Sequence, residues 1–246
     1  MANDRITLIE GGGSAGGSAV SAVSGESAFT VDAAAGAVTM SPDMKEAFLQ
    51  ALGLASGYTD LQYVRSNGSY VITDLTLNGN YTFTFKGRAT ASGAIVSPYT
   101  AHSSSTMRQG LLLFNTASHK VAPYWPDVSW SDQPVPAAID FTQTLTIVQD
   151  RNGIAISQGE EAWTCSYSGS GATYDVPLYI FGSANPGHAD YNAGIFESLT
   201  VSLDGGTVAR FVPKLRNEDN VAGLYDTVAR RFYTSAGGAF IAGPAA

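Results

Sequence analysis

The sequence is poor in cysteine, in charge and in long hydrophobic runs. It has a single cysteine, Cys165, among 246 residues, which excludes a disulfide within the chain. Its neighbours in the strand-like stretch 163–167 predict that Cys165 is a small buried hydrophobic residue. Because no disulfide can brace the fold, we expect its stability to come from a hydrophobic core.

Charged residues make up only 14% of the chain, and most of them are acidic. Lys and Arg number 13 against 21 Asp and Glu, which gives a formal net charge of −8. An acidic protein repels phosphate backbones and anionic membrane surfaces. We therefore expect no nucleic acid among its partners.

No hydrophobic run approaches the ~18 residues that a membrane-spanning segment needs, so we expect no membrane insertion. Arg5 is the only cation near the N-terminus, and no long apolar run follows it. This pattern predicts no secretory signal peptide, and hence a protein made in the cytoplasm. Release of a virion by lysis is one route by which such a protein reaches the outside of a cell.

Residues 1–57 differ in composition from the rest of the chain. Gly, Ser, Ala and Val dominate, and the run 11–18 consists only of Gly, Ser and Ala. Such a segment buries too little apolar surface to build a core, so we predict a flexible N-terminal arm.

One short helix is predicted within this arm, over residues 42–52. Ser41 is a favourable N-cap, and Pro42 suits the first helical position. Met44, Phe48 and Leu52 then share one face of a helix too short to be stable alone. That face either docks the arm and drives homo-oligomerisation, with a trimer as first guess, or folds back onto the chain's own domain.

From Tyr58 onward the pattern alternates as in β-strands, with no convincing helix. Residues 81–85 place three aromatics on one face, and residues 139–148 alternate over a longer span. Asn152-Gly153 and Asp204-Gly205-Gly206 then follow apolar runs, as in tight hairpins that need positive φ angles. We predict an all-β, two-sheet antiparallel sandwich over residues 58–246.

The closing segments carry a resemblance to a known family. A strand over 196–203 is followed by the Asp-Gly-Gly turn, by Arg210-Phe211-Val212-Pro213, and by the strand over 221–228. This order resembles laminin-G-like, concanavalin A-like lectin and glucanase jelly-roll domains, of the kind found in bacteriophage and bacterial surface proteins. The resemblance spans roughly residues 58–243 and implies a jelly roll, a fold that serves lectins, glucanases and structural modules alike.

A glucanase of this family would need alternating carboxylates on one strand, with the two catalytic groups ~5 Å apart. Glu160 and Glu161 are adjacent and so point to opposite faces, and Glu197 and Asp204 are too far apart on their hairpin. We therefore expect no enzymatic activity, and a glycoside hydrolase is the least favoured function.

The best candidate for ligand recognition is the proline-bounded stretch with Tyr124, Trp125 and Trp130, followed by Asp132. Aromatic faces beside short polar groups are typical of carbohydrate sites, because sugar C–H faces pack on the rings. The alternative is that these aromatics plug one end of the sandwich or bury an interface. Trp163 is predicted to lie in the core.

The sequence offers few candidates for a metal site. His102, His119 and His188 are isolated and lack the spacing of zinc ligands. Asp190 and Asn192 lie in a loop rich in oxygen donors, which makes calcium possible there, although such loops commonly just connect strands. We expect no cofactor.

These observations favour a non-enzymatic virion protein, such as a phage fibre, head decoration or tail component. Its jelly roll would be displayed and its arm would bind other virion proteins, with a cell-surface glycan as a candidate ligand. The alternative is a carbohydrate-binding module of a bacterial surface protein, located at the cell surface.

Overall fold

The computed structural model describes residues 57–66, 68–90, 116–123, 125, 132–169, 177–182 and 194–246, together with the backbone of strands in 29–32, 37–40, 95–96, 101–102, 108–109, 112–115 and 172–176. The chain divides into two compact units, Met1–Gly57 and Tyr58–Ala246. The division falls where the composition changes from the Gly/Ser/Ala-rich region to the alternating strands.

The first unit contains an antiparallel hairpin of β1 (Phe29–Asp32) and β2 (Ala37–Met40), in which Val31 pairs with Val38. This hairpin was not predicted, because its short strands lie among Ala and Gly residues that carry little alternation. The helix predicted over 42–52, with Met44, Phe48 and Leu52, lies outside the described residues.

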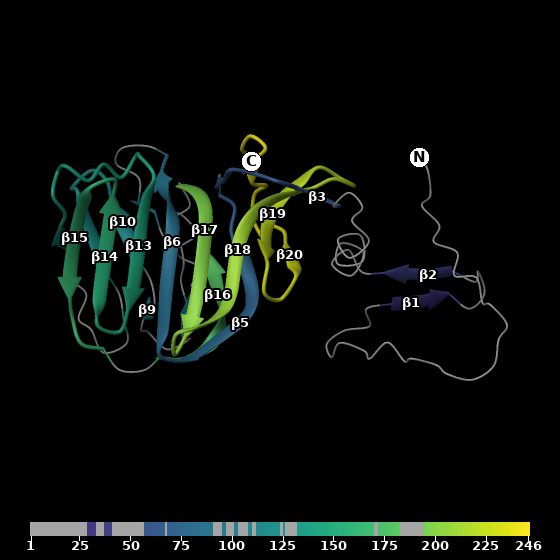
Figure 1. Ribbon diagram of the computed structural model, residues 1–246, viewed down its shortest axis with the longest axis horizontal. Coiled ribbons are helices and arrows are strands. Elements are labelled where there is room, and N and C mark those ends of the chain that lie inside the picture. The colour runs from purple at the N-terminus through teal and green to yellow at the C-terminus, as the bar shows by residue number, and fades with distance from the viewer. Residues whose placement is uncertain are drawn as a thin grey trace. The chain divides into compact units, whose positions relative to one another are not determined.

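The second unit is built on one large antiparallel sheet, which confirms the predicted all-β class (Figure 1). Its strands run in the spatial order β15, β14, β13, β6, β17, β18, β19, β20. Their bounds are β6 (Tyr81–Ala89), β13 (Leu145–Asp150), β14 (Gly153–Gln158), β15 (Glu161–Ser166), β17 (Gly194–Leu203), β18 (Gly206–Arg216), β19 (Val221–Asp226) and β20 (Arg231–Tyr233).

Three short strands extend this sheet. β3 (Tyr58–Asp60) pairs with β18, and β4 (Val64–Arg65) pairs with both β17 and β21 (Ile241–Ala242). Because β3 opens the second unit and β21 lies at its C-terminal end, both ends of this unit are tied to the same sheet.

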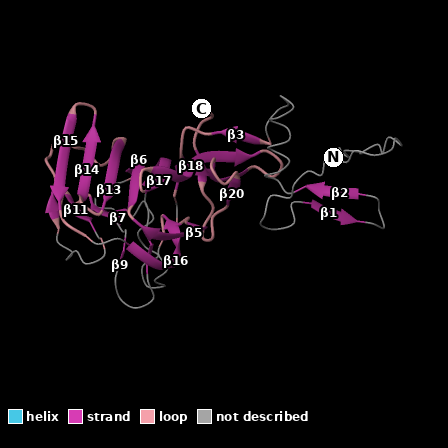
Figure 2. Ribbon diagram, turned by 60° about the horizontal axis from the view of Figure 1, so that its bottom comes forward, coloured by secondary structure: helices cyan, strands magenta, loops and turns pink. Residues whose placement is uncertain are grey.

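Smaller antiparallel sheets lie along one face of the large sheet and form the second layer of a sandwich (Figures 1 and 2). One joins β5 (Val71–Gly79) to β16 (Ala172–Ile180). Another has the order β12, β11, β10, β7, and a third pairs β8 with β9. Their bounds are β7 (Ile95–Val96), β8 (Ala101–His102), β9 (Arg108–Gln109), β10 (Leu112–Asn115), β11 (Lys120–Pro123) and β12 (Gln133–Pro134).

The core lies between the two layers and follows from the alternation in the sequence. Phe83 and Phe85 of β6 and Ile147 of β13 are fully buried. Their neighbours Thr84 and Val148, which point to the other face of the sheet, are not. Leu178 and Ile180 of β16 are buried from the opposite layer. Each such side chain contributes about 1.5–3 kcal/mol by leaving water, so the sandwich needs no disulfide.

Both predicted hairpins are present. β13 and β14 pair across Arg151-Asn152, and β17 and β18 pair across a turn in which Asp204 and Gly205 have φ angles of 47° and 84°. These positive φ values explain why Asp and Gly stand there, because other residues adopt them at a cost. Cys165 was predicted to be buried but is only partly so, since no described strand pairs with the outer side of β15.

A partly enclosed lysine joins β3 to the sheet. The Lys214 ammonium lies 3.4 Å from an Asp60 oxygen and 4.6 Å from the centre of the Tyr225 ring, with Tyr58 at 5.8 Å. Ion-pair and cation–π attraction offset the desolvation of this ammonium. Tyr58, the first residue of the second unit, is thereby held against β18 and β19.

Candidate functional site

The outer face of the large sheet, opposite the core, carries mainly small polar side chains. Strand register places one residue from each of six strands in a single row across it: Thr164, Ala155, Val148, Thr84, Thr200 and Arg210. A second row holds Ser166, Gly153, Asp150, Thr82, Ser202 and Thr207. Short hydroxyl side chains therefore line a broad, largely uncharged surface.

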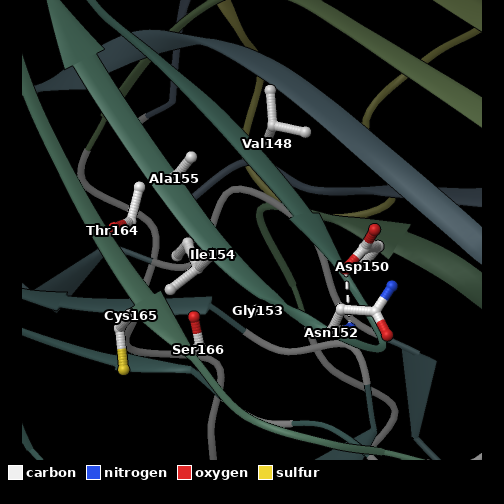
Figure 3. Close-up of a pocket in the computed structure, with 9 residues that line it drawn as sticks. All are labelled: Val148, Asp150, Asn152, Gly153, Ile154, Ala155, Thr164, Cys165 and Ser166. Carbon is white, nitrogen blue, oxygen red and sulfur yellow. Dashed lines mark hydrogen bonds between the residues drawn. The ribbon is translucent and has the colours of Figure 1, made fainter.

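A shallow pocket of about 240 Å³ lies at the β15 end of this face (Figure 3). Val148, Ala155 and Thr164 project from the same side of three neighbouring strands, because paired residues share a face. Asp150 and Asn152 stand at the β13–β14 turn, on another side of the pocket. The pocket thus combines an apolar floor with a polar rim.

Local hydrogen bonding orients that rim. The Asn152 backbone N–H donates to Asp150 Oδ1 over 2.7 Å, which holds the carboxylate against the turn. The second oxygen of Asp150 has no hydrogen bond to a described residue. Next to it, Arg151 donates from Nη1 to Asn80 Oδ1 over 3.1 Å, toward another part of the sheet.

Gly153 lines the pocket and permits close packing of β14 against β15. A Cβ atom at this position would lie 2.6 Å from the Cys165 carbonyl oxygen and would clash with the backbone of β15. Glycine therefore allows β14 and β15 to approach closely at the start of β14, where the turn ends. Beyond the pocket, burial raises the pKa of the Tyr167 phenol, whose oxygen accepts a 3.0 Å hydrogen bond from Gln149, so this phenol stays neutral at physiological pH.

The pocket can hold a neutral ligand rich in hydroxyl groups. A carboxylate, an amide and the hydroxyls of Thr164 and Ser166 supply acceptors and donors at its rim. Val148 and Ala155 offer apolar contact to the C–H groups of such a ligand. None of the described residues that line the pocket is aromatic, so these residues offer no ring for stacking.

The predicted aromatic loop is only partly within the described residues. Trp125 is 2% exposed, and its ring meets Phe83 edge-on with centroids 6.4 Å apart. Trp125 is therefore a core residue, which is the alternative role that the sequence left open, and its ring offers no face to a sugar. Asp132 is exposed and lies 3.6 Å from Lys120, while Tyr124 and Trp130 lie outside the described residues.

The remaining predicted sites are the candidate metal ligands. Asp190 and Asn192, the weak calcium candidates, lie outside the described residues, as does His188. Within the described part of the chain, no group of three His, Cys, Asp or Glu side chains could hold a metal ion. The same part contains no helix long and apolar enough to cross a membrane.

The pocket residues were missed by sequence reasoning. The hairpin at Asn152-Gly153 was recognised, and the stretch 163–167 was recognised as strand-like. The pairing of β15 with β14, which brings Thr164 and Ser166 beside that hairpin, has no local signal in the sequence.

Comparisons with known proteins give no direct guide to function. No model of a protein family matches the chain. A search of curated proteins finds no matching relative.

Proposed function

We propose that this protein is a non-enzymatic structural and adhesion component of a virion. In this proposal the sandwich is displayed and weakly binds a glycan, while the first unit attaches it to other virion proteins and associates with further copies. The observation that carries it is the outer face with its pocket, a broad, hydroxyl-rich surface with few charges.

The pocket favours a neutral sugar over an acidic one. Among the described residues that line it, Asp150 is the only charged one, and the chain as a whole carries a net charge of −8. A carboxylate accepts hydrogen bonds from sugar hydroxyls and repels the carboxylate of an acidic sugar. Binding is expected to be weak, because the pocket is shallow and its described lining residues include no aromatic platform.

Glycan binding is tested with an Asp150→Ala variant on an array of neutral and acidic glycans. A hydrogen bond to a charged group contributes about 1.5–3 kcal/mol, so its loss should weaken binding at least about tenfold. Thr207→Ala is the matched control, because Thr207 is exposed in the same row but lies on β18. Equal binding by both variants and the parent would refute the role of the pocket.

The virion assignment is tested separately. Antibodies against residues 58–246 should label intact particles in electron micrographs, and deletion of residues 1–57 should abolish incorporation of the chain. Label on the bacterial envelope with none on particles would favour a carbohydrate-binding module of a cell-surface protein, the second candidate that the pocket supports. Release of reducing sugars from β-glucans by the parent would contradict the proposal that the protein is not an enzyme.

A further inference from the structure

The two ends of the large sheet are built differently. At one end β20 has only 3 residues, and Arg231 within it forms an ion pair with Asp74 at 2.6 Å. At the other end β15 has 6 residues and, after Glu161, contains only Ala, Trp, Thr, Cys and Ser. Short strands and charges protect a sheet edge from pairing with another chain, and β15 has few of these protections.

The outer edge of β15 presents unused backbone groups. The two-residue turn Gly159-Glu160 closes the β14–β15 hairpin at the Gln158–Glu161 pair, so hydrogen-bonded and non-bonded pairs alternate from there. The backbone groups of Ala162, Thr164 and Ser166 consequently point away from β14. All three residues are exposed, and no described residue forms a hydrogen bond with their backbone on that side.

We propose that two copies of the chain pair antiparallel through this edge, with Thr164 on the twofold axis. In that register Thr164 of each copy faces Thr164 of the other, and Ala162 faces Ser166. Each of these pairs exchanges both of its N–H···O=C bonds, so every free backbone group of the edge finds a partner. The inference does not depend on what the pocket binds.

The side chains of β15 suit this self-pairing. Trp163, partly buried against the core, comes opposite Cys165 of the second copy, and sulfur–aromatic contact is favourable. Glu161 comes opposite Tyr167, so the acidic ends of the two strands lie apart. No charged residue follows between 162 and 169, so like charges do not face each other. A second copy is therefore the occupant that the edge fits.

Pairing along the edge leaves the outer face open. The row from Arg210 to Thr164 would continue into the second copy, and the two pockets would lie side by side across the axis. Two weak sites on one rigid body bind a repetitive surface more tightly than one site does.

Register-specific cross-linking tests the pairing in the full-length chain carrying Cys165→Ser. Thr164→Cys should form an intermolecular disulfide under mild oxidation, because Cα atoms of a hydrogen-bonded antiparallel pair lie about 5.5 Å apart. Ser166→Cys is the matched control on the same strand, since its two copies would lie about 14 Å apart. Cross-linking of both variants at equal rates, or of neither, would overturn the proposal.

Sedimentation of the full-length chain provides a second measurement. Thr164→Pro removes the N–H group on the twofold axis without removing a hydrogen bond to β14. The average molecular mass in sedimentation should therefore fall toward that of the monomer, while the melting temperature stays equal to that of the parent. Thr164→Lys should also lower the mass, because it places two ammonium groups face to face. Thr207→Lys, with the same charge change far from β15, should not. A parent and two Thr164 variants of equal mass would refute the edge contact.

Discussion

Replacing Trp125 by Ala should destabilise the sandwich strongly, because the ring is buried rather than displayed. The side chain is 2% exposed and lies edge-on to Phe83. Gly169 passes so close that a Cβ there would lie 2.1 Å from the indole. Truncation of a buried Trp or Phe to Ala costs about 3–5 kcal/mol, through lost burial and the cavity left behind.

Such a loss is a large part of the roughly 5–15 kcal/mol by which a typical domain is stable. Guanidinium unfolding followed by circular dichroism measures it, with Val228→Ala as control. Val228 is 49% exposed, so its truncation should change the free energy of unfolding by no more than about 0.5 kcal/mol. A loss below about 1 kcal/mol for Trp125→Ala, together with lost glycan binding, would refute the core role and restore the aromatic loop as a sugar site.

Three further changes test other parts of the chain. Gly153→Ala should lower the free energy of unfolding by about 1–3 kcal/mol in denaturant titrations, because its Cβ would meet the Cys165 carbonyl, and an unchanged midpoint would contradict this. The Arg216 guanidinium lowers the pKa of Asp219, chiefly by hydrogen bonding, below its ordinary value of 3.8. Asp219 therefore stabilises the fold above pH 3.8, and this contribution is lost as the pH falls through its folded pKa. The Asp219→Asn variant should accordingly have a slightly lower free energy of unfolding than the parent at pH 6, and nearly the same one near pH 2. Phe48→Asp should reduce self-association through the first unit, and equal sedimentation of variant and parent would argue against that role.

Local chemistry in the sequence was sufficient for the fold class. Two-residue alternation over 81–85 predicts a strand with one buried face, and β6 buries Phe83 and Phe85 accordingly. The strand predicted from the alternation over 139–148 was wrong in its first part, because residues 139–144 form turns and irregular backbone and β13 begins only at Leu145. The Asp204-Gly205 turn predicts its hairpin because positive φ angles are a property of single residues, and both residues have them. In the other hairpin the turn residues are Arg151-Asn152 rather than Asn152-Gly153, and Asn152 does not have a positive φ angle. The change in composition near Tyr58 coincides with the boundary between the two units.

Tertiary structure decided which residues meet and which are covered. Trp125 is a residue type that commonly forms the aromatic platform of a sugar site. Its packing against Phe83 and Gly169 nevertheless makes it part of the core. The pocket and the open edge both depend on β15 pairing with β14 and with no other described strand. Order among strands is set by long-range packing of their buried faces, and such packing leaves no local pattern by which Thr164 or Ser166 could have been singled out.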